Sequence, residues 1–366
     1  MTPSAATGSA ARPPAALAGL RMPAEWEPHV STWIGWPHHE PDWPGKLAPI
    51  PWVYAEIVRV LAAHERVDIC CHSVPVMEDA RHHLSAHGVD ASSYQLHLVP
   101  SDRVWLRDSG AATVVDAAGT ASLIHWQFTG WAKYENHALD AGVGEAMARI
   151  TGLPRHEPQR PDGHGRVVLE GGAIDVNGAG RLLTTEECLL STLQERNPGL
   201  DRAGYERVFA QWLGIHEVLW LGNGCVGDDT HGHVDDIARF TSVDTVVLSY
   251  EADPDDANHA ASVDNLRRLQ LAGGEAGTLR VITLPYPRPV MMDGVRLPAS
   301  YANFYVANGV VIVPTFNDPT DRHALNTLAS LFPDRAIVGI HAVDLVWGLG
   351  TLHCLSQQQP RGSRSP

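Results

Sequence analysis

Residues 53–70 read VYAEIVRVLAAHERVDIC, a stretch that contains both kinds of element expected in the rest of the chain. Its first part places apolar side chains at the spacing of one helix face, namely at Val53, Ile57, Val60 and Leu61. Residues 66–70 then alternate between polar and apolar side chains, which is typical of a strand. The stretch therefore predicts a helix that is followed directly by a strand.

The same two patterns recur along the chain in a fixed proportion. Helical spacing returns at about 137–151, 203–213, 259–272 and 321–332, so that with residues 53–61 five helices are predicted. Strand-like runs outnumber the helices by about two to one, and they are Ala111–Val115, Ser122–Trp126, Val167–Leu169, Arg181–Thr184, Val218–Leu221, Thr245–Leu248, Arg280–Leu284, Val310–Pro314 and Ala336–Ile340. This ratio argues against a TIM barrel and, less strongly, against a doubly wound sheet.

Five units of similar length account for this proportion. Each unit would hold one helix and two or three strands, and about 68 residues per unit would fill residues 21–360. Residues 1–20 are rich in Ala, Pro and Ser and lack both the basic start and the apolar run of a signal peptide. We therefore expect flexible tails at 1–20 and 361–366.

Composition and charge exclude several classes of function. The chain of 366 residues has 27 Lys+Arg and 42 Asp+Glu, which gives a formal charge of −15. Such an acidic chain is a poor partner for nucleic acid or for an anionic membrane surface. No run approaches the roughly 18 apolar residues that a membrane-spanning helix needs. Its five cysteines form no Cys-x-x-Cys pair, so we expect a cytoplasmic protein without structural zinc.

The segment 224–236 gathers imidazoles and carboxylates in a Gly-rich loop. If it were extended, His231, His233 and Asp235 would point the same way and could bind a metal ion. Alternatively, His233 could act as a general acid and base with Asp235 beside it. A solvated acidic loop with an incidental pair of histidines is the third interpretation.

Two carboxylates occupy positions that suggest a site. Asp108 follows Arg107 just before a predicted strand, where an ion pair of purely structural value is the common alternative. Glu170 ends the apolar run 167–169 and precedes two glycines, which leave space for another group to approach. A bulge with a paired glutamate would give the same pattern.

Cys354 is the best candidate for a nucleophile, because it lies between a Gly-rich turn and polar residues. Cys70 and Cys71 lie in an apolar strand and are expected to be inert, and Cys188 heads a predicted helix or turn and is expected to be buried. Cys354 could likewise be a small buried apolar residue.

The candidate residues recur at a regular interval. Asp108, Glu170 and His233 follow one another about 60 residues apart, and Cys354 comes after about twice that interval. Asn303 lies between the last two. One functional residue per structural unit would produce this spacing.

Several sequence motifs resemble those of the agmatine deiminase family and follow one another in the same order. This family also includes the bacterial type of peptidylarginine deiminase. The motifs extend over nearly the whole folded chain, and they are residues 22–29, 105–108, 126–128, 169–172, 182–190, 232–235, 299–304 and the pair His353-Cys354. The resemblance implies a five-bladed pseudo-symmetric α/β propeller of ββαβ-type units, with residues 21–360 as a single guanidino-modifying domain. Five predicted helices agree with this fold.

The resemblance also implies roles for individual residues. Cys354 would be the nucleophile, His233 the acid and base, Asp108 and Asp235 the carboxylates that hold a guanidinium, and Glu170 the partner that orients His233. Two carboxylates suit a guanidinium because it offers paired N–H donors and a delocalised positive charge. We expect Asn303, Trp105 and Trp126 to contribute to substrate binding, although a Trp beside a strand is more often part of the core. No metal or other cofactor is required.

The expected reaction is hydrolysis of agmatine to N-carbamoylputrescine and ammonia through a covalent thiouronium on Cys354. Segments 348–352, 229–232 and 173–175 depart from the usual family sequences, so the substrate could instead be free arginine, peptide-linked arginine or another guanidino compound. An amidinotransferase, an inactive homologue that senses guanidines and a metal-dependent hydrolase remain as rivals. The partner is therefore a small cationic guanidino molecule, and the sequence leaves the oligomeric state open, with a homodimer as one option.

Overall fold

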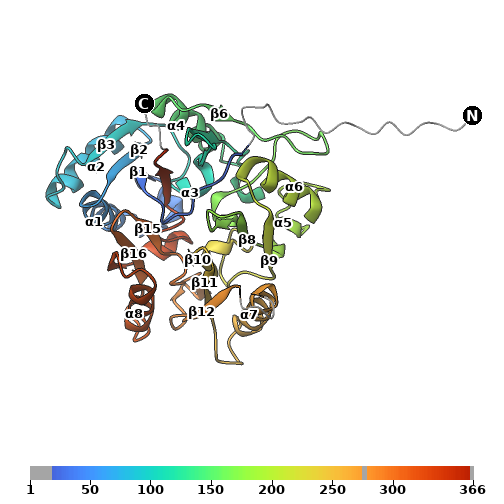
Figure 1. The fold of residues 1–366 in the computed structure, drawn as a ribbon. Helices are drawn as coiled ribbons and strands as arrows, with labels where there is room; N and C mark the ends of the chain where they lie inside the picture. The colour runs from blue at the N-terminus through green and yellow to red at the C-terminus, as the bar shows by residue number, and fades with distance from the viewer. Residues whose placement is uncertain (1–18, 274–277, 363–366) are drawn as a thin grey trace, which may run out of the picture.

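The structure, a computed structural model, describes residues 19–273 and 278–362 of the chain and has a mixed α/β fold (Figure 1). The predicted α/β class is confirmed. The predicted tails at 1–20 and 361–366 fall mostly outside the described residues. Of the tail residues that the structure describes, Leu20 is buried in the core, and the Arg361 backbone N–H donates to the Pro28 carbonyl at 2.7 Å.

The first sheet joins the two ends of the described chain. Its strand order is β18 (Ser356–Pro360), β1 (His29–Gly35), β2 (Arg66–Cys71) and β3 (Tyr94–Leu98). β18 is antiparallel to β1, whereas β1, β2 and β3 are parallel to one another. Parallel neighbours need a crossover, and α1 (Ile50–Ala62) and α2 (Val74–Ala86) provide the two crossovers.

Each of the other four larger sheets in the described residues repeats one connection: an antiparallel hairpin, a helix, and a third strand parallel to the second. The second group holds β4 (Ala112–Val115), β5 (Ala121–Ile124), α4 (Val143–Thr151) and β6 (Arg155–His156), and the third holds β7 (Asp175–Val176), β8 (Arg181–Thr185), α5 (Glu186–Leu190), α6 (Arg202–Leu213) and β9 (Glu217–Leu221). The fourth group holds β10 (Ala238–Ser242), β11 (Thr245–Tyr250), α7 (His259–Gly273) and β12 (Arg280–Pro285). The fifth holds β15 (Tyr305–Ala307), β16 (Val310–Thr315), α8 (Asp321–Leu331) and β17 (Ala336–His341).

Shorter elements connect these groups. A small hairpin of β13 (Met291–Met292) and β14 (Val295–Arg296) precedes β15, and α3 (Leu106–Ser109) precedes β4. Short 3-10 helices are η2 (Glu40–Asp42), η3 (Gly130–Ala132), η4 (Asp140–Gly142), η5 (Gly171–Ala173), η6 (Val234–Asp236) and η7 (Leu345–Gly348). No helix in the described part of the chain has the length and apolar character needed to span a membrane.

Figure 1 shows the groups of elements one after another around the molecule, with the colours in chain order and α6, α7 and α8 on the outside. α1 lies beside both β2 and β16, so the first and last groups are neighbours. Ile57 and Leu61 of α1 pack in one core cluster with Ile69 of β2 and Ile312 of β16. Apolar burial therefore holds the first group against the last.

The five predicted helices are confirmed as α1, α4, α6, α7 and α8, although α4 begins later than expected, at Val143. α2 was not predicted, because it buries only Ala80 and Leu84 and has too few apolar residues for a clear periodic pattern. The prediction of a strand at Val167–Leu169 is wrong, because an isolated bridge between Val168 and Gln127 is the only strand-like pairing that the structure describes for this run. The run is apolar because it is buried in the core, not because it is paired in a sheet.

Helix α6 ends the crossover of the third group and has well-defined termini. The Asp201 carboxylate accepts from the Gly204 backbone N–H at 2.8 Å, and Gly214 ends the helix at φ 70°. Replacing Asp201 by Ala removes an N-cap acceptor and should lower the free energy of unfolding by about 1 kcal/mol. Asp201→Asn, which keeps an acceptor, should cost much less. Urea denaturation measures both, and equal losses in the two variants would contradict a capping role.

Candidate active site

The five regularly spaced candidate residues lie just before β4, β7, β10, β15 and β18, with one residue before each of these strands. Asp108 lies in α3 ahead of β4, and Glu170 lies directly before η5, ahead of β7. His233 lies directly before η6, ahead of β10, and the segments before β15 and β18 carry Asn303 and Cys354. This placement accounts for the regular interval between the residues in the sequence. All of them, together with Asp235, are buried.

Cys354 lies among groups that keep its thiol protonated. The Asn303 side-chain N–H donates to its sulfur at 3.0 Å, and the thiol donates to Asp235 Oδ2 at 3.6 Å. Burial raises the pKa of Cys354 well above its usual value, and the carboxylates of Asp235, Asp236 and Asp108 raise it further. A nearby cation is therefore needed before the thiolate can form at neutral pH.

His233 lies between two carboxylates. Its Nδ1 is 3.8 Å from Asp108 Oδ1, and its Nε2 is 3.7 Å from Glu170 Oε2. Burial alone would lower the pKa of His233, but Asp108, the neighbouring Cys188 and Glu170 outweigh burial and raise it well above its usual value. Neither ring nitrogen has a hydrogen-bond partner among the described residues. His233 is therefore a buried imidazolium paired with a carboxylate on each side.

Glu170 is fully buried and is neutralised by Arg196, a residue that the sequence analysis did not single out. Arg196 Nε lies 3.2 and 3.3 Å from the two Glu170 oxygens, and its Nη2 donates to the Thr230 carbonyl at 2.5 Å. Burial opposes ionisation of Glu170, but Arg196 and His233 lower its pKa to about 2. A buried carboxylate needs such a partner, and this need is the one signal that could have pointed to Arg196.

Asp108 is held by two donors. Its Oδ1 accepts from the Gly172 backbone N–H and its Oδ2 accepts from Trp131 Nε1, both at 2.9 Å. Burial, Asp235 and Glu170 raise the pKa of Asp108 to about 6, against the opposing effect of His233. A Cβ at position 172 would lie 2.5 Å from His233 Nδ1, so glycine at this position allows the imidazole to approach. The predicted space beside Glu170 is thus occupied by His233.

Asp235 and its neighbour Asp236 differ in ionisation. Burial opposes ionisation of Asp235, but His353, His233 and Arg239 outweigh it and lower its pKa. Burial and the Asp235 charge raise the pKa of Asp236 well above its usual value, and Asp236 Oδ1 accepts from the Asn303 amide at 3.0 Å. Asp236 was not predicted, because nothing in the sequence separates the two adjacent aspartates.

A cavity of about 330 Å³ reaches Cys354 and Asp108. Trp105 lines it, as expected, whereas Trp126 does not and instead packs in the core cluster that contains Val167 and Leu169. The other lining residues form a mostly apolar wall with a few charged groups: Pro41, Asp42, Pro44, Arg103, Trp131, Tyr134, Asp229, Thr230, Val295, Leu297, Trp347, Gly348, Leu349 and Gly350. Cys354 is therefore reachable although only 6% of its surface is exposed.

The expected alternation of His231, His233 and Asp235 is wrong. His231 has a left-handed backbone (φ 65°), and its Nε2 lies 3.0 Å from Ser191 Oγ, away from the buried His233. Within the described residues, two groups bring three ligand-type atoms within 4.8 Å, and they are Glu170, Cys188, His233 and Asp235, Asp236, Cys354. A metal ion in the first group would compete with Arg196, which already neutralises Glu170.

The remaining cysteines lie as predicted. Cys70 and Cys71 are buried in β2, where burial raises the pKa of both thiols, that of Cys71 to about 12. Cys188 is buried in α5, as expected, with its backbone N–H donating to Thr185 Oγ1 at 3.0 Å. Among the five cysteines, Cys354 lines the cavity.

Comparison with known proteins gives consistent results. The family model of Porphyromonas-type peptidyl-arginine deiminases matches residues 21–360. The agmatine deiminase of Pseudomonas aeruginosa (strain LESB58) is 34% identical over 363 residues, which cover 93% of this chain and 96% of that protein. The solved agmatine deiminase of Enterococcus faecalis is 28% identical with a TM-score of 0.84, covering 94% of this chain and 96% of that one. A substrate-bound agmatine deiminase of C. jejuni is 26% identical with a TM-score of 0.83, covering 94% and 97%.

The buried pair of Glu170 and Arg196 generates a stability prediction. Arg196→Met leaves the Glu170 charge without its partner and should lower the free energy of unfolding by about 3–5 kcal/mol at pH 7. Adding Glu170→Gln to Arg196→Met removes that charge and should restore part of the loss. Urea denaturation of the two single variants and the double variant measures the coupling, and additive losses would contradict it.

Proposed function

Because the chain belongs to the Porphyromonas-type peptidyl-arginine deiminase family, we propose that it hydrolyses agmatine to N-carbamoylputrescine and ammonia. The observation that carries the proposal is a cavity lined by the Cys354 thiol and the Asp108 carboxylate, with the buried imidazole of His233 3.8 Å from Asp108. Both groups of relatives, curated and structurally solved, include agmatine deiminases that cover nearly the whole chain.

In the proposed complex, Asp108 and Asp235 hold the guanidinium of the substrate. Asp235 Oδ1 is buried without a hydrogen-bond partner in the described part of the chain, so it can accept from a guanidinium N–H. Paired carboxylates would fix the guanidinium carbon in front of the Cys354 sulfur. Asn303, which donates to that sulfur, would keep the sulfur in place.

The bound cation would also activate the nucleophile. The Asp108 and Asp235 carboxylates raise the pKa of Cys354, and a guanidinium placed between them offsets their charge. The thiolate then attacks the guanidinium carbon and forms a tetrahedral adduct. His233 gives its proton to the departing nitrogen, ammonia leaves, and an S-alkylthiouronium remains on Cys354.

A water molecule completes the reaction. Having lost its proton, His233 can accept one from water, which attacks the thiouronium carbon. Collapse of this second adduct breaks the bond to sulfur and releases N-carbamoylputrescine. Glu170 stays ionised through its pairing with Arg196 and stabilises the imidazolium of His233 when it re-forms.

Charged groups that line the cavity support a substrate with two positive ends. They are Asp42, Arg103 and Asp229, of which Asp229 is already paired with Lys133 and Tyr134. Arg103 forms an ion pair with Asp42, and Asp42 Oδ2 is buried without a hydrogen-bond partner among the described residues. Agmatine carries an ammonium that this oxygen could accept from, whereas the carboxylate of free arginine would meet Asp42 and Asp229 unfavourably. The apolar wall between the two ends suits the methylene chain of agmatine.

We also propose that the five larger sheets are the blades of a pseudo-symmetric five-bladed α/β propeller, with residues 21–360 as a single catalytic domain. The repeated connection of hairpin, helix and parallel strand supports this arrangement. The first blade would be completed by β18 from the other end of the described chain. Active-site residues just before the first strand of each blade would then face the common axis.

Leu349 supports a rival substrate with a different tail. Agmatine deiminases usually have a glycine at this place in the segment before the nucleophile, whereas this chain has Leu349. Leu349 has a left-handed backbone (φ 67°) and lines the cavity. A bulky side chain there narrows the space for the part of the substrate beyond the guanidinium. Another guanidino compound, or transfer of the amidino group to an amine instead of water, would use the same thiol.

The first test offers agmatine, free arginine and an arginine peptide to the purified protein and measures ureido product and ammonia. Turnover of agmatine, abolished by Cys354→Ser and unaffected by a chelator, is expected. Loss of activity with chelator but not with Cys354→Ser would favour a metal-dependent hydrolase. Amidino transfer to an added amine, with little ammonia, would favour an amidinotransferase.

The second test concerns the cation that activates Cys354. A haloacetamidine, which carries a positive amidine, should alkylate Cys354 at pH 7 at least about ten-fold faster than the neutral haloacetamide of the same leaving group. Burial and carboxylates hold the pKa of the free thiol high, so the neutral reagent should gain speed only as the pH rises. Cys354→Ser is the control for labelling of other thiols, and equal rates for the two reagents would contradict activation by the substrate.

The third test concerns the far end of the cavity. Asp42→Asn removes the proposed acceptor for the ammonium, and the KM for agmatine should rise by about ten-fold with a smaller change in kcat. The KM for a guanidino compound without the ammonium should change little in the same variant. A uniform rise for both compounds would show that Asp42 acts on the fold and not on the ammonium.

A further inference from the structure

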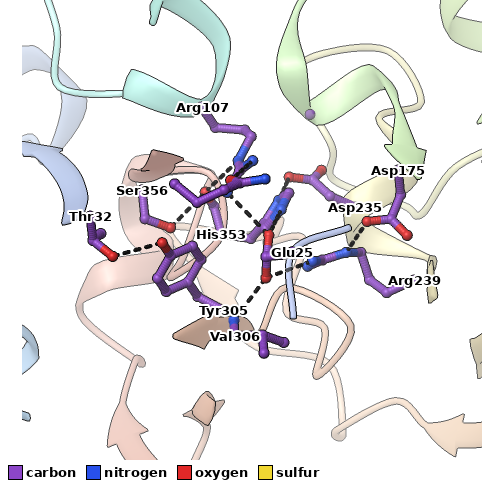
Figure 2. A network of polar contacts seen from close by, with 12 residues as sticks. Glu25, Thr32, Arg107, Asp175, Asp235, Arg239, Tyr305, Val306, His353 and Ser356 are labelled. Atoms are coloured by element: carbon purple, nitrogen blue, oxygen red, sulfur yellow. Dashed lines mark hydrogen bonds and ion pairs between the residues drawn. The ribbon is translucent and has the colours of Figure 1, made fainter. Parts of the chain in front are cut away.

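His353, which precedes the nucleophile, has a carboxylate on each of its two ring nitrogens (Figure 2). Its Nδ1 lies 2.6 Å from Asp235 Oδ2, and its Nε2 lies 2.9 Å from Glu25 Oε2. The whole residue is 1% exposed, so water cannot take the place of either partner. The mechanism outlined above makes no use of this imidazole.

The two contacts decide where the protons are. A neutral imidazole has one N–H, and an ionised carboxylate can only accept, so one of the two contacts would be repulsive. A proton on Glu25 could relieve it, but Glu25 already accepts from the Val306 backbone N–H at 2.7 Å and from two arginines. Glu25 is therefore ionised. Burial alone would raise the pKa of Glu25, but Arg239, His353 and Arg107 outweigh burial and hold this pKa well below its usual value.

Asp235 uses one oxygen for these contacts and keeps the other free. Its Oδ2 accepts from both His353 and the Cys354 thiol, whereas Oδ1 has no hydrogen-bond partner among the described residues. Two donors on Oδ2 favour the ionised form of Asp235. The extra proton in the chain of contacts therefore belongs on His353.

We infer that His353 is a buried imidazolium held between Glu25 and Asp235, and that it is a positioning residue which keeps Asp235 ionised with Oδ1 turned toward the substrate guanidinium. The positioning role rests on the proposed function. The charge on His353 does not, because it follows from the hydrogen bonds of the protein alone.

The surrounding residues fix this imidazolium in place. Its backbone N–H donates to the Asn303 side chain at 3.0 Å, which links His353 to the residue that holds the nucleophile. Arg239 binds Glu25 at 2.9 Å and Asp175 at 2.8 Å, and Figure 2 shows it on the opposite side of Glu25 from Arg107. The ionisable groups that face His353 and Asp235 from the packed elements are Glu25, Arg107, His233, Asp236, Arg239 and Cys354.

The inference sets the sign of a pH effect. Burial would raise the pKa of Asp235, and the hydrogen bond and charge of His353 are the largest effects that lower it. Without the imidazolium, Asp235 should take up a proton at higher pH than in the unmodified protein. The acid limb of kcat/KM should therefore move to higher pH, because a protonated Asp235 no longer attracts the guanidinium.

The charge is tested without substrate. Protein labelled with ¹⁵N-histidine should show, at neutral pH, both ring nitrogens of His353 bonded to hydrogen, and His353→Gln assigns the signals by their loss. One protonated and one unprotonated ring nitrogen would overturn the inference. This spectrum needs no turnover, so it remains decisive if agmatine proves not to be the substrate.

The positioning role is tested with two variants and a matched control. His353→Gln should raise the KM for agmatine by about ten-fold or more while kcat changes by less than about three-fold, and the acid limb should shift upward. Glu25→Gln, which touches neither thiol nor substrate, should produce the same pattern more weakly. His97→Gln is the control, since His97 Nε2 also binds a buried aspartate, Asp68, at 2.8 Å, but in the first sheet between β2 and β3.

The outcomes distinguish a positioning role of His353 from a purely structural role. A shift of the acid limb in the His353 and Glu25 variants, absent in the His97 variant at a similar loss of thermal stability, supports the positioning role. Equal losses of kcat and an unshifted pH profile in all three would overturn it. Absence of agmatine turnover in the unmodified protein would instead contradict the proposed function.

Discussion

Buried negative charge is the constraint on which this structure depends. Asp108, Glu170 and Asp235 are at most 5% exposed, and each lies within reach of another carboxylate or of the Cys354 thiol. A group of like charges in a nonpolar interior is stable only if cations or neutralising protons accompany it. The protein uses both, with Arg196 and His353 as cations and a proton on Asp236.

The same constraint explains why the site suits a cationic substrate. Compensation is complete around Glu170 and Glu25 but incomplete beside Cys354, where Asp235 Oδ1 has no hydrogen-bond partner among the described residues. A guanidinium supplies the missing charge and the missing donors together. Binding and activation of the thiol thus follow from one event, and a neutral molecule of similar shape would achieve neither.

Sequence patterns predicted α1, α4, α6, α7 and α8, and the apolar face is most regular in α1 and α6. The patterns failed at α2, which buries little, and at residues 167–169, which are buried outside any sheet. Asp108, Glu170, His233, Asn303 and Cys354 could be found from residue chemistry, spacing and family resemblance. Arg196, Glu25 and Asp236 could not, since their roles depend on contacts between segments far apart in the chain, and Trp126 was misplaced because a tryptophan beside a strand fits both core and pocket.

The position of Cys354 also has a consequence for synthesis. Cys354 and the closing strand β18 follow every other described helix and strand along the chain, and β18 pairs with β1, the first described strand. A nascent chain emerges from the ribosome in this same order. The carboxylates and His233 can therefore assemble before the thiol reaches them, and a product cut short before residue 354 lacks both the nucleophile and the edge that covers β1. Termination before residue 354 would yield chains with an exposed strand edge and no reactive centre, and such an edge is open to pairing with other chains.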